Sequence, residues 1–347
     1  MSDKSVVIFG AGAVGGTIAA YMARAGHDVT VMDPWYAHIL SIQQRGLHVT
    51  EPSREFTVKL RALQVDQVDL LPGPIDILFI SVKSYDTRWV VRYMAPHLSP
   101  DGFVVSAQNS LNEEIIAEEL GADRTMGLVV ITSAGVFEPG KLIRYTTPGD
   151  RLEFQVGELD GRGTPRLAEV AGLLAAVGDT VTTDNIWGLL WSKLMHNCMA
   201  NAVSGLTGMS SNAMYTDATV QKLLPRIGRE CVLVADAYGM KLEPVYGAGP
   251  EHYRDLESGG EEVIRQGFLK EAALRSGAKD NPPSLLQDVM KGRRSEVDYL
   301  NGLLVRKGAA KGIPTPINHA VTEAMHRLDG GLLKPDPSNL ELFREYL

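Results

Sequence analysis

A lysine and two asparagines recur at intervals of four within one apolar stretch of the chain. Lys193, Asn197 and Asn201 belong to the window 184–201, where most other side chains are apolar. That composition predicts a buried helix, and the spacing places the three polar side chains on one of its faces. Loss of water lowers the pKa of a lysine and makes it a plausible proton donor near neutral pH. The alternative is a lysine that reaches solvent beside two amides that cap backbone. The asparagines that accompany Lys193 favour the chemical interpretation.

Two serines and a glutamate further along the chain are also candidates. Ser284 with Gln287, and Ser295 with Asp298, have the spacing of a capping box, which predicts that each serine starts a helix. A hydroxyl at an uncommitted helix N-terminus also suits a substrate carboxylate. Glu296 would then lie in the first turn of its helix, where the helix dipole favours a negative charge. Capping alone explains Ser284 equally well, and dipole stabilisation alone explains Glu296.

Glycines follow the first apolar segment with G-x-G-x-x-G spacing, between a predicted strand, Ser5–Phe9, and a predicted helix, Gly12–Arg24. Glycine permits a tight turn and lets a pyrophosphate approach the N–H groups of a helix N-terminus. The strand before the glycines and the helix after them are the setting that a dinucleotide site requires. The candidate cofactor-binding residues in this turn are Gly10, Gly12, Ala13, Val14 and Gly15.

An acidic residue follows the second predicted strand. Val29–Met32 predicts that strand, and Asp33 stands at its end. A carboxylate at this place accepts both ribose hydroxyls of NAD and repels the 2′-phosphate of NADP. Asp33 therefore favours NAD as the cofactor, with NADP as the alternative. The structural alternative is that Asp33 opens a turn before Pro34.

Two more polar residues fall where predicted strands end. Lys83 follows the apolar run 77–82, and Asn109 follows the predicted strand Phe103–Ser106. Open α/β sheets bind ligands at the carboxyl ends of their strands, so both residues are candidates for a ligand site. Taken singly, a solvated loop lysine and a turn-forming asparagine explain them better.

Strand and helix patterns alternate through the first half of the chain, which predicts a largely parallel, doubly wound α/β sheet. The other expected elements there are the strands Ile75–Val82, Met126–Thr132 and Leu152–Val156, the helices Ala37–Arg45, Asn112–Leu120 and Pro165–Val177, and a small hairpin of Leu47–Thr50 with Phe56–Leu60. From Asp184 onward the pattern is almost wholly helical, with windows at Ile186–Ser204, Ala218–Tyr238, Glu261–Arg275 and Glu296–Lys311. We therefore expect a Rossmann domain over residues 1–183 and an all-α domain over residues 184–347.

Length and composition exclude several classes of protein. The chain has 347 residues, 44% of them hydrophobic and 22% charged, which suits a globular protein of two domains. A net charge of −8 argues against nucleic acid as the main partner. There is no basic leader and no apolar run long enough to span a bilayer, so we expect a cytoplasmic protein without a membrane partner. Cys198 and Cys231 stand in no C-x-x-C motif and beside no histidine cluster, which indicates neither a disulfide framework nor a metal site.

Taken together, these pieces resemble the ketopantoate reductase (2-dehydropantoate 2-reductase) family. The matching segments are Gly10–Gly16, Ser81–Ser84, Gln108–Asn109, Trp191–Leu194 with Asn197 and Asn201, Ser284–Asp288, Ser295–Gly302 and Gly312–Pro316. They recur in the family's order over nearly the whole chain, which is more specific than any one motif.

The resemblance implies a Rossmann domain joined to a helical domain, an active site in the cleft, and hydride delivery from reduced nicotinamide to a 2-oxo acid. By this analogy Lys193 is the general acid that protonates the carbonyl oxygen, and Glu296 holds Lys193 in place. The analogy assigns the substrate's carboxylate and hydroxyl to Asn109, Asn197, Asn201 and Ser284, and places Lys83 and Asn109 beside the nicotinamide. A homodimer is plausible for the apolar helical domain.

Three departures from the family pattern bear on specificity. Members that use NADP carry an arginine just after the second strand, where this chain has Asp33. The usual Asn-Gly-x-Gly is here the run 109–112, Asn-Ser-Leu-Asn, and the segment 246–283 is longer than in compact members. Reduction of ketopantoate to pantoate is the leading expectation. A catabolic NAD-dependent dehydrogenase of another 2-hydroxy acid, or a dinucleotide-sensing protein without turnover, are the alternatives.

Overall fold

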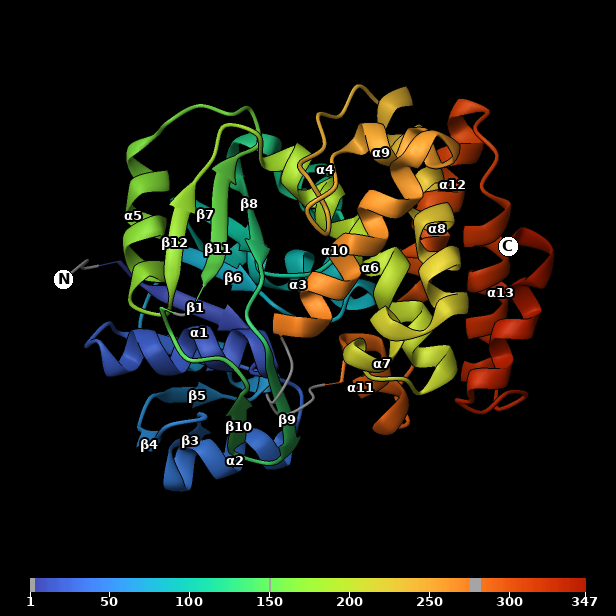
Figure 1. The fold of residues 1–347 in the computed structure, drawn as a ribbon. Coiled ribbons are helices and arrows are strands. Elements are labelled where there is room, and N and C mark those ends of the chain that lie inside the picture. Colours follow the sequence, from blue (N-terminus) through green and yellow to red (C-terminus); the bar gives the residue numbers. More distant parts are fainter. Residues whose placement is uncertain (1–3, 150, 275–281) are drawn as a thin grey trace. The chain divides into compact units, whose positions relative to one another are not determined.

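The computed structural model describes residues 4–149, 151–274 and 282–347, and the chain divides into two compact units, Met1–Ile186 and Trp187–Leu347 (Figure 1). The expected boundary, between residues 183 and 184, lies just before this division. Residues 275–281 lie outside the described residues. The helix expected at Glu261–Arg275 is therefore described only as far as Leu274.

The first unit is built on a twisted sheet of eight strands among the described residues. Their order is β12 (Asp179–Thr182), β11 (Leu152–Glu158), β8 (Thr125–Val130), β7 (Leu98–Ser106), β6 (Ile75–Ile80), β1 (Val6–Phe9), β2 (Val29–Met32) and β5 (Arg61–Leu63). All neighbouring pairs are parallel except β11 with β8. The prediction of a largely parallel α/β sheet is therefore confirmed, and β1 and β6 meet where the strand order reverses.

Helices cover both faces of this sheet because successive strand residues point to opposite sides. One face packs against α1 (Ala13–Arg24), α2 (Tyr36–Arg45) and α5 (Pro165–Ala175) through residues such as Ile8 and Val31. The other face packs against α3 (Thr87–Met94) and α4 (Asn112–Leu120) through residues such as Val7 and Phe9. This double winding leaves the carboxyl ends of β1 and β6 open to a ligand.

A second sheet of four strands lies against the α1 side of the unit. Its order is β4 (Glu55–Val58), β3 (Leu47–Thr50), β10 (Lys141–Arg144) and β9 (Ala134–Glu138). The expected hairpin is present as β3 and β4, and it pairs in parallel with β10, which comes from a distant part of the chain. Leu142 of β10 packs against Gly16 of α1, where a Cβ would lie 2.9 Å from the leucine. The small sheet thus reaches the helix that follows the glycine turn.

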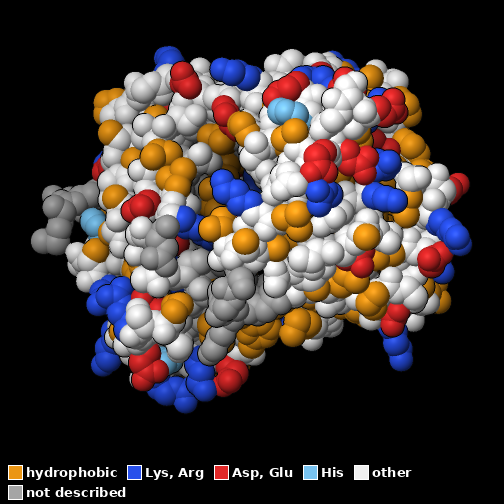
Figure 2. Space-filling view, in the orientation of Figure 1, with side chains coloured by type: hydrophobic (Ala, Val, Ile, Leu, Met, Phe, Trp, Pro, Cys, Tyr) orange, Lys and Arg blue, Asp and Glu red, His pale blue; other side chains and the backbone are white. Residues whose placement is uncertain are grey.

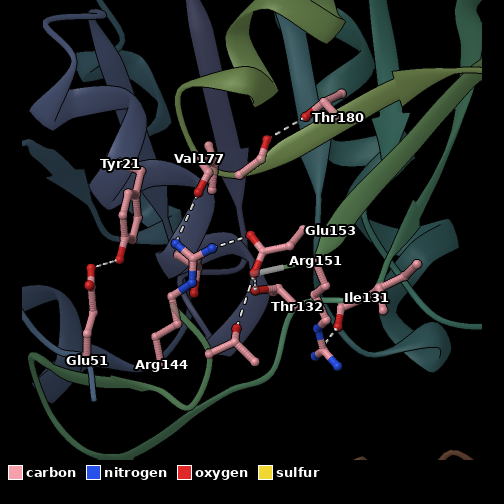
Figure 3. A network of polar contacts seen from close by, with 12 residues as sticks. Tyr21, Glu51, Ile131, Thr132, Arg144, Arg151, Glu153, Val177 and Thr180 are labelled. Atoms are coloured by element: carbon pink, nitrogen blue, oxygen red, sulfur yellow. Dashed lines mark hydrogen bonds and ion pairs between the residues drawn. The ribbon is translucent and has the colours of Figure 1, made fainter. Parts of the chain in front are cut away.

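A buried polar network joins the two sheets (Figure 3). The guanidinium group of Arg144, fully buried on β10, pairs with the carboxylate of Glu153 on β11 and donates to the carbonyl oxygen of Val177 at 3.0 Å. It also lies over the ring of Tyr21 on α1, 4.5 Å from the ring centroid. Burial and the neighbouring Glu51 carboxylate raise the pKa of Tyr21 to about 12, so its hydroxyl stays protonated and donates to Glu51.

In its described residues the second unit consists of helices and the loops between them, with no strand apart from one isolated bridge between Val245 and Ala248. Its helices are α6 (Ile186–Thr207), α7 (Ser211–Thr216), α8 (Ala218–Ala237), α9 (Pro250–Arg254), α10 (Glu261–Leu274), α11 (Ser284–Met290), α12 (Asn301–Lys311) and α13 (Pro316–Asp329). The prediction of an all-α second domain is confirmed.

A chain of buried hydrogen bonds holds four of these helices together. The carboxylate of Glu230 on α8 accepts the backbone N–H groups of Ile317 and Asn318 at 2.9 Å each, at the start of α13. The side chain of Asn318 accepts from Asn301 of α12 at 2.9 Å, and Asn301 also donates to the carbonyl oxygen of Cys198 on α6 at 3.1 Å. The backbone of α6 is thereby fixed within the unit.

Charged side chains of both signs lie close together over the helical unit on the face drawn in Figure 2. The helical unit includes ion pairs of Arg254 with Asp236 and of Arg265 with Glu262. None of the helices in the described part of the chain is both long and apolar enough to cross a membrane.

Candidate active site

The glycine turn of the first unit is held by backbone geometry that only glycine permits. Gly10 has a φ of 104°, and a Cβ there would lie 2.8 Å from the carbonyl carbon of Ser81. A Cβ on Gly15 would collide with the carbonyl oxygen of Gly10 and the hydroxyl of Ser81. Ser81 in turn donates a hydrogen bond of 2.6 Å to that carbonyl oxygen. Gly10 and Gly15 therefore bring the turn, α1 and the end of β6 into close contact.

Gly12, unlike the crowded Gly10 and Gly15, faces open space that could hold a pyrophosphate. No atom lies within 4 Å of the place where a Cβ on Gly12 would stand. Gly12 caps the N-terminus of α1 without a side-chain hydrogen bond, and the first turn of α1 carries no acidic residue. The N–H groups of the first turn, which includes Ala13 and Val14, and the positive end of the helix dipole suit a phosphate group there. The turn therefore has the open space and the donors that a dinucleotide requires.

Asp33 follows β2, and its carboxylate accepts hydrogen bonds from backbone N–H groups of two segments. One carboxylate oxygen accepts the N–H of Ala11 at 2.7 Å, and the other accepts the N–H of Trp35 at 2.8 Å. The contact with Trp35 forms the turn before Pro34 that was expected as the structural alternative for Asp33. The first contact ties the end of β2 to the glycine turn. Each oxygen keeps a second lone pair, so the turn and a ribose contact are compatible.

Lys83 and Asn109 lie in two loops at the carboxyl ends of neighbouring strands. β6 ends at Ile80, so Lys83 lies a few residues beyond the strand, half-buried, at the start of a short turn. Asn109 follows β7 and is also half-buried. Its carbonyl oxygen accepts from the hydroxyl of Ser84 at 3.4 Å, so the two loops are in contact. The structure therefore brings the surroundings of these two candidates together.

The departure from Asn-Gly-x-Gly builds a cross-link between the same loops. Asn112 donates to the carbonyl oxygen of Asn109 at 2.6 Å and to Ser84 at 3.1 Å, and it accepts from Thr87 at 3.0 Å. Ser110 has a φ of 84°, a conformation that favours glycine. Ser110 thus adopts this left-handed conformation without being a glycine, and Asn112 fixes the end of the turn.

Lys193, Asn197 and Asn201 all lie on α6, and their spacing of four places them on one face, as predicted. Asn197 and Asn201 are buried, at 2% and 6% exposure, and Lys193 is half-buried. The apolar residues around them, such as Trp191 and Leu194, are buried, which confirms the interpretation of this window as a core helix. The amine of Lys193 thus belongs to the helix face that also carries two amides.

The segment that carries Glu296 differs from the prediction. Ser295 does not start a long helix. Its hydroxyl donates to the carboxylate of Asp329 at 2.6 Å and accepts the N–H of Val297 at 3.5 Å. Only a single turn, Val297–Tyr299, follows, and the backbone at Leu300 is non-helical before α12 begins. Glu296 therefore does not lie in the first turn of a long helix. It is buried at 4% exposure in a segment that Asp329 anchors to the end of α13.

Ser284 is also placed differently from the expectation. The helix α11 does begin here, but Pro283 is its capping residue and Ser284 is its first helical residue. The side chain of Gln287 donates to the carbonyl oxygen of Pro282 at 3.1 Å, so the capping box is absent. Proline before Ser284 fixes the backbone and leaves the half-buried hydroxyl without a capping role.

The candidates thus form two groups, each described within its own unit. The cofactor candidates gather around the carboxyl ends of β1, β2 and β6, and the polar face of α6 carries Lys193 with both asparagines. The sequence analysis assigned no role to three residues that fix the backbone near the candidates. Ser81 binds the glycine turn, Asn112 links the loops after β6 and β7, and Asn301 binds the backbone of α6. Only Asn112 could have been singled out from the sequence, because it stands where the family pattern has a glycine.

The comparisons with known proteins cover both units. Residues 6–160 match the family model described as "Ketopantoate reductase PanE/ApbA", and residues 185–329 match "Ketopantoate reductase PanE/ApbA C terminal". The 2-dehydropantoate 2-reductase of Halobacterium salinarum is 26% identical over 315 residues, which cover 90% of this chain and 94% of the relative. That of Mesorhizobium japonicum is 28% identical, covering 93% of this chain and 97% of the relative.

Solved structures share the whole fold. A PanE/ApbA family ketopantoate reductase from Ralstonia eutropha JMP134 is 29% identical with a TM-score of 0.76, covering 94% of this chain and 99% of the other. A D-mandelate dehydrogenase solved with NADH and anilino(oxo)acetate has a TM-score of 0.80 at 22% identity, with the same coverage, and shows the likeness of fold alone.

Proposed function

Because the chain belongs to the ketopantoate reductase family, we propose that it uses NADH to reduce a 2-oxo acid to the 2-hydroxy acid, with Lys193 as the general acid. The enzyme is an NAD(P)-dependent oxidoreductase acting on CH–OH groups. The polar face of α6 carries the proposal, because it presents one amine and two buried amides from an otherwise apolar helix.

The residues of the chain divide the chemistry between them. Reduced nicotinamide, when bound, supplies the hydride that reaches the carbonyl carbon of the 2-oxo acid. The ammonium group of Lys193 donates a proton to the carbonyl oxygen, which gains negative charge in the same step. Lys193 then recovers a proton from solvent. Glu296 holds the ammonium group in place, so Glu296 is a positioning residue for the acid.

The remaining candidates bind the substrate and the cofactor. Amide and hydroxyl groups suit a carboxylate and a hydroxyl, and four residues provide them: Asn109, Asn197, Asn201 and Ser284. Lys83 adds a positive charge beside the nicotinamide. The substrate we favour is ketopantoate. The cytoplasmic location and a homodimer remain parts of this proposal.

Asp33 is the basis for proposing NADH. A fixed carboxylate at the end of β2 accepts ribose hydroxyls and repels a 2′-phosphate. The same residue supports a second candidate, an NAD-dependent catabolic dehydrogenase of another 2-hydroxy acid. A protein that only senses the dinucleotide is disfavoured, because a sensor needs none of the four residues Lys193, Asn197, Asn201 and Glu296.

The test is a kinetic comparison of the full chain with NADH and NADPH over a panel of 2-oxo acids with branched, hydroxylated and aromatic side chains. We expect kcat/KM with NADH to exceed that with NADPH about tenfold or more, which corresponds to about 1.4 kcal/mol. Asp33→Asn removes the charge and should narrow that ratio. A preference for NADPH would contradict the cofactor assignment, and tight dinucleotide binding without turnover of any acid would favour a sensor.

A further inference from the structure

His38 of α2 lies fully buried between the glycine turn and the small sheet. Its Nε2 is 2.9 Å from the carbonyl oxygen of Ala11, and its Nδ1 is 2.9 Å from the backbone nitrogen of Gly140, in the turn between β9 and β10. The N–H of Gly140 can only donate, so Nδ1 is the acceptor. The proton of the neutral ring is therefore on Nε2, which donates to Ala11.

The surroundings of the ring favour this neutral form. Burial lowers the pKa of His38, against the opposing effect of the Asp33 carboxylate, which is the charged group acting on this ring among the described residues. Trp35 stacks on one face of the ring, with 5.1 Å between the centroids and planes 13° apart. A ring held on its face and at both nitrogens has one orientation.

Ala11 is consequently fixed through both of its backbone polar groups. Its N–H donates to Asp33 at 2.7 Å, and its carbonyl oxygen accepts from His38. A trans peptide bond is planar, so the N–H of Gly12 points opposite to the carbonyl oxygen of Ala11. His38 thereby sets the direction of the Gly12 N–H, at the position where the turn is open.

We propose that His38 is a positioning residue for the dinucleotide, holding the Gly10–Gly12 turn in its binding conformation and anchoring it to the β9–β10 turn through Gly140. The inference rests on the proposed function in one respect, that a dinucleotide binds at the glycine turn. It adds a role for the small sheet, which is joined to the glycine turn through Gly140 and His38.

Two variants separate the two hydrogen bonds. Asparagine at position 38 can accept from Gly140 but is too short to reach Ala11, whereas glutamine can donate to Ala11. We expect His38→Asn to raise the dissociation constant of NADH, measured by fluorescence, about five- to tenfold, the usual effect of losing one hydrogen bond. His38→Gln should bind NADH within about twofold of the native protein. In both, kcat at saturating NADH and the KM for the oxo acid should stay near native values.

Ser41→Ala is the matched control. Ser41 lies on the same helix and donates to the carbonyl oxygen of Pro139 at 3.3 Å, so the variant loosens the same contact with the β9–β10 turn without touching Ala11. It should bind NADH normally even if its melting temperature falls. A dissociation constant that follows the melting temperature across all three variants would show a merely structural role and overturn the inference.

If His38→Asn does not fold, His38→Gln alone tests the role. It keeps a donor to Ala11, so its dissociation constant for NADH should stay within about twofold of native, and a rise of about tenfold or more beyond any rise in Ser41→Ala would overturn the inference. If the native protein binds neither NADH nor NADPH, the proposed function fails as well. If it binds NADH and His38→Asn binds equally well, the role of His38 alone fails.

Discussion

Buried ionisable side chains at single positions decide how this protein responds to pH. Glu113, in the first turn of α4, is fully buried, and burial raises the pKa of its carboxyl group to about 8. The hydroxyl of Ser106 lies beside it and opposes the rise only in part. The native protein therefore holds this carboxyl group protonated at neutral pH, whereas the unfolded chain ionises it.

The stability consequence has a definite sign. Between an ordinary pKa near 4.5 and the native value of about 8, the folded state binds more protons than the unfolded state, so the free energy of unfolding falls as the pH rises. The full difference is on the order of 5 kcal/mol. Urea unfolding at pH 5 and pH 8 should show Glu113→Gln gaining stability relative to the native protein at pH 8. The neighbouring Glu114→Gln is the control, and an equal pH dependence in Glu113→Gln and the native protein would contradict the assignment.

At the scale of elements, the join between the two sheets of the first unit depends on one buried ion pair. Desolvation by burial raises the pKa of Glu153, and Arg144 opposes that rise. Removing one partner leaves the other charge buried without compensation. We expect Arg144→Met to lower the free energy of unfolding by about 3–5 kcal/mol.

The double variant Arg144→Met with Glu153→Leu should recover most of that loss, because it leaves no buried charge unpaired. A double-mutant cycle measured by urea unfolding tests this coupling. Additive effects of the two single substitutions would show that the pair does not act as a unit.

The regular elements were predictable where the sequence pattern is local. Val29–Met32 and Asn112–Leu120 have the expected bounds, because apolar runs and helix periodicity act over neighbouring residues. The strands β9 and β10 escaped prediction, since β10 is defined by pairing with β3 from a distant segment. Ser295 was misread for a similar reason. Its partner Asp329 lies far along the chain, and this contact ties Ser295 to the end of α13, which local capping signals do not indicate.

For the whole molecule, the sequence predicted a Rossmann unit followed by a helical unit and the face of α6 that carries Lys193. It could not reveal how the cofactor turn is held. The contacts of His38 with Ala11 and Gly140 join three segments that lie far apart in the sequence. Such contacts produce no periodic pattern from which they could be predicted. The proposed chemistry assigns cofactor binding to one unit and proton transfer to the other. Substitutions at the glycine turn and at Asp33 should therefore change cofactor affinity, and those at Lys193 should change kcat.

The most direct test of the central claim is single-turnover and steady-state kinetics of Lys193→Ala and of Lys193→Met, which keeps the length of the side chain. Lys222→Ala, at an exposed lysine of α8, is the matched control. We predict that both Lys193 variants lose about 100-fold or more in kcat with the dissociation constant of NADH unchanged, and that Lys222→Ala keeps native values. A Lys193→Met enzyme with kcat within a few fold of native would contradict the assignment of Lys193 as the proton donor.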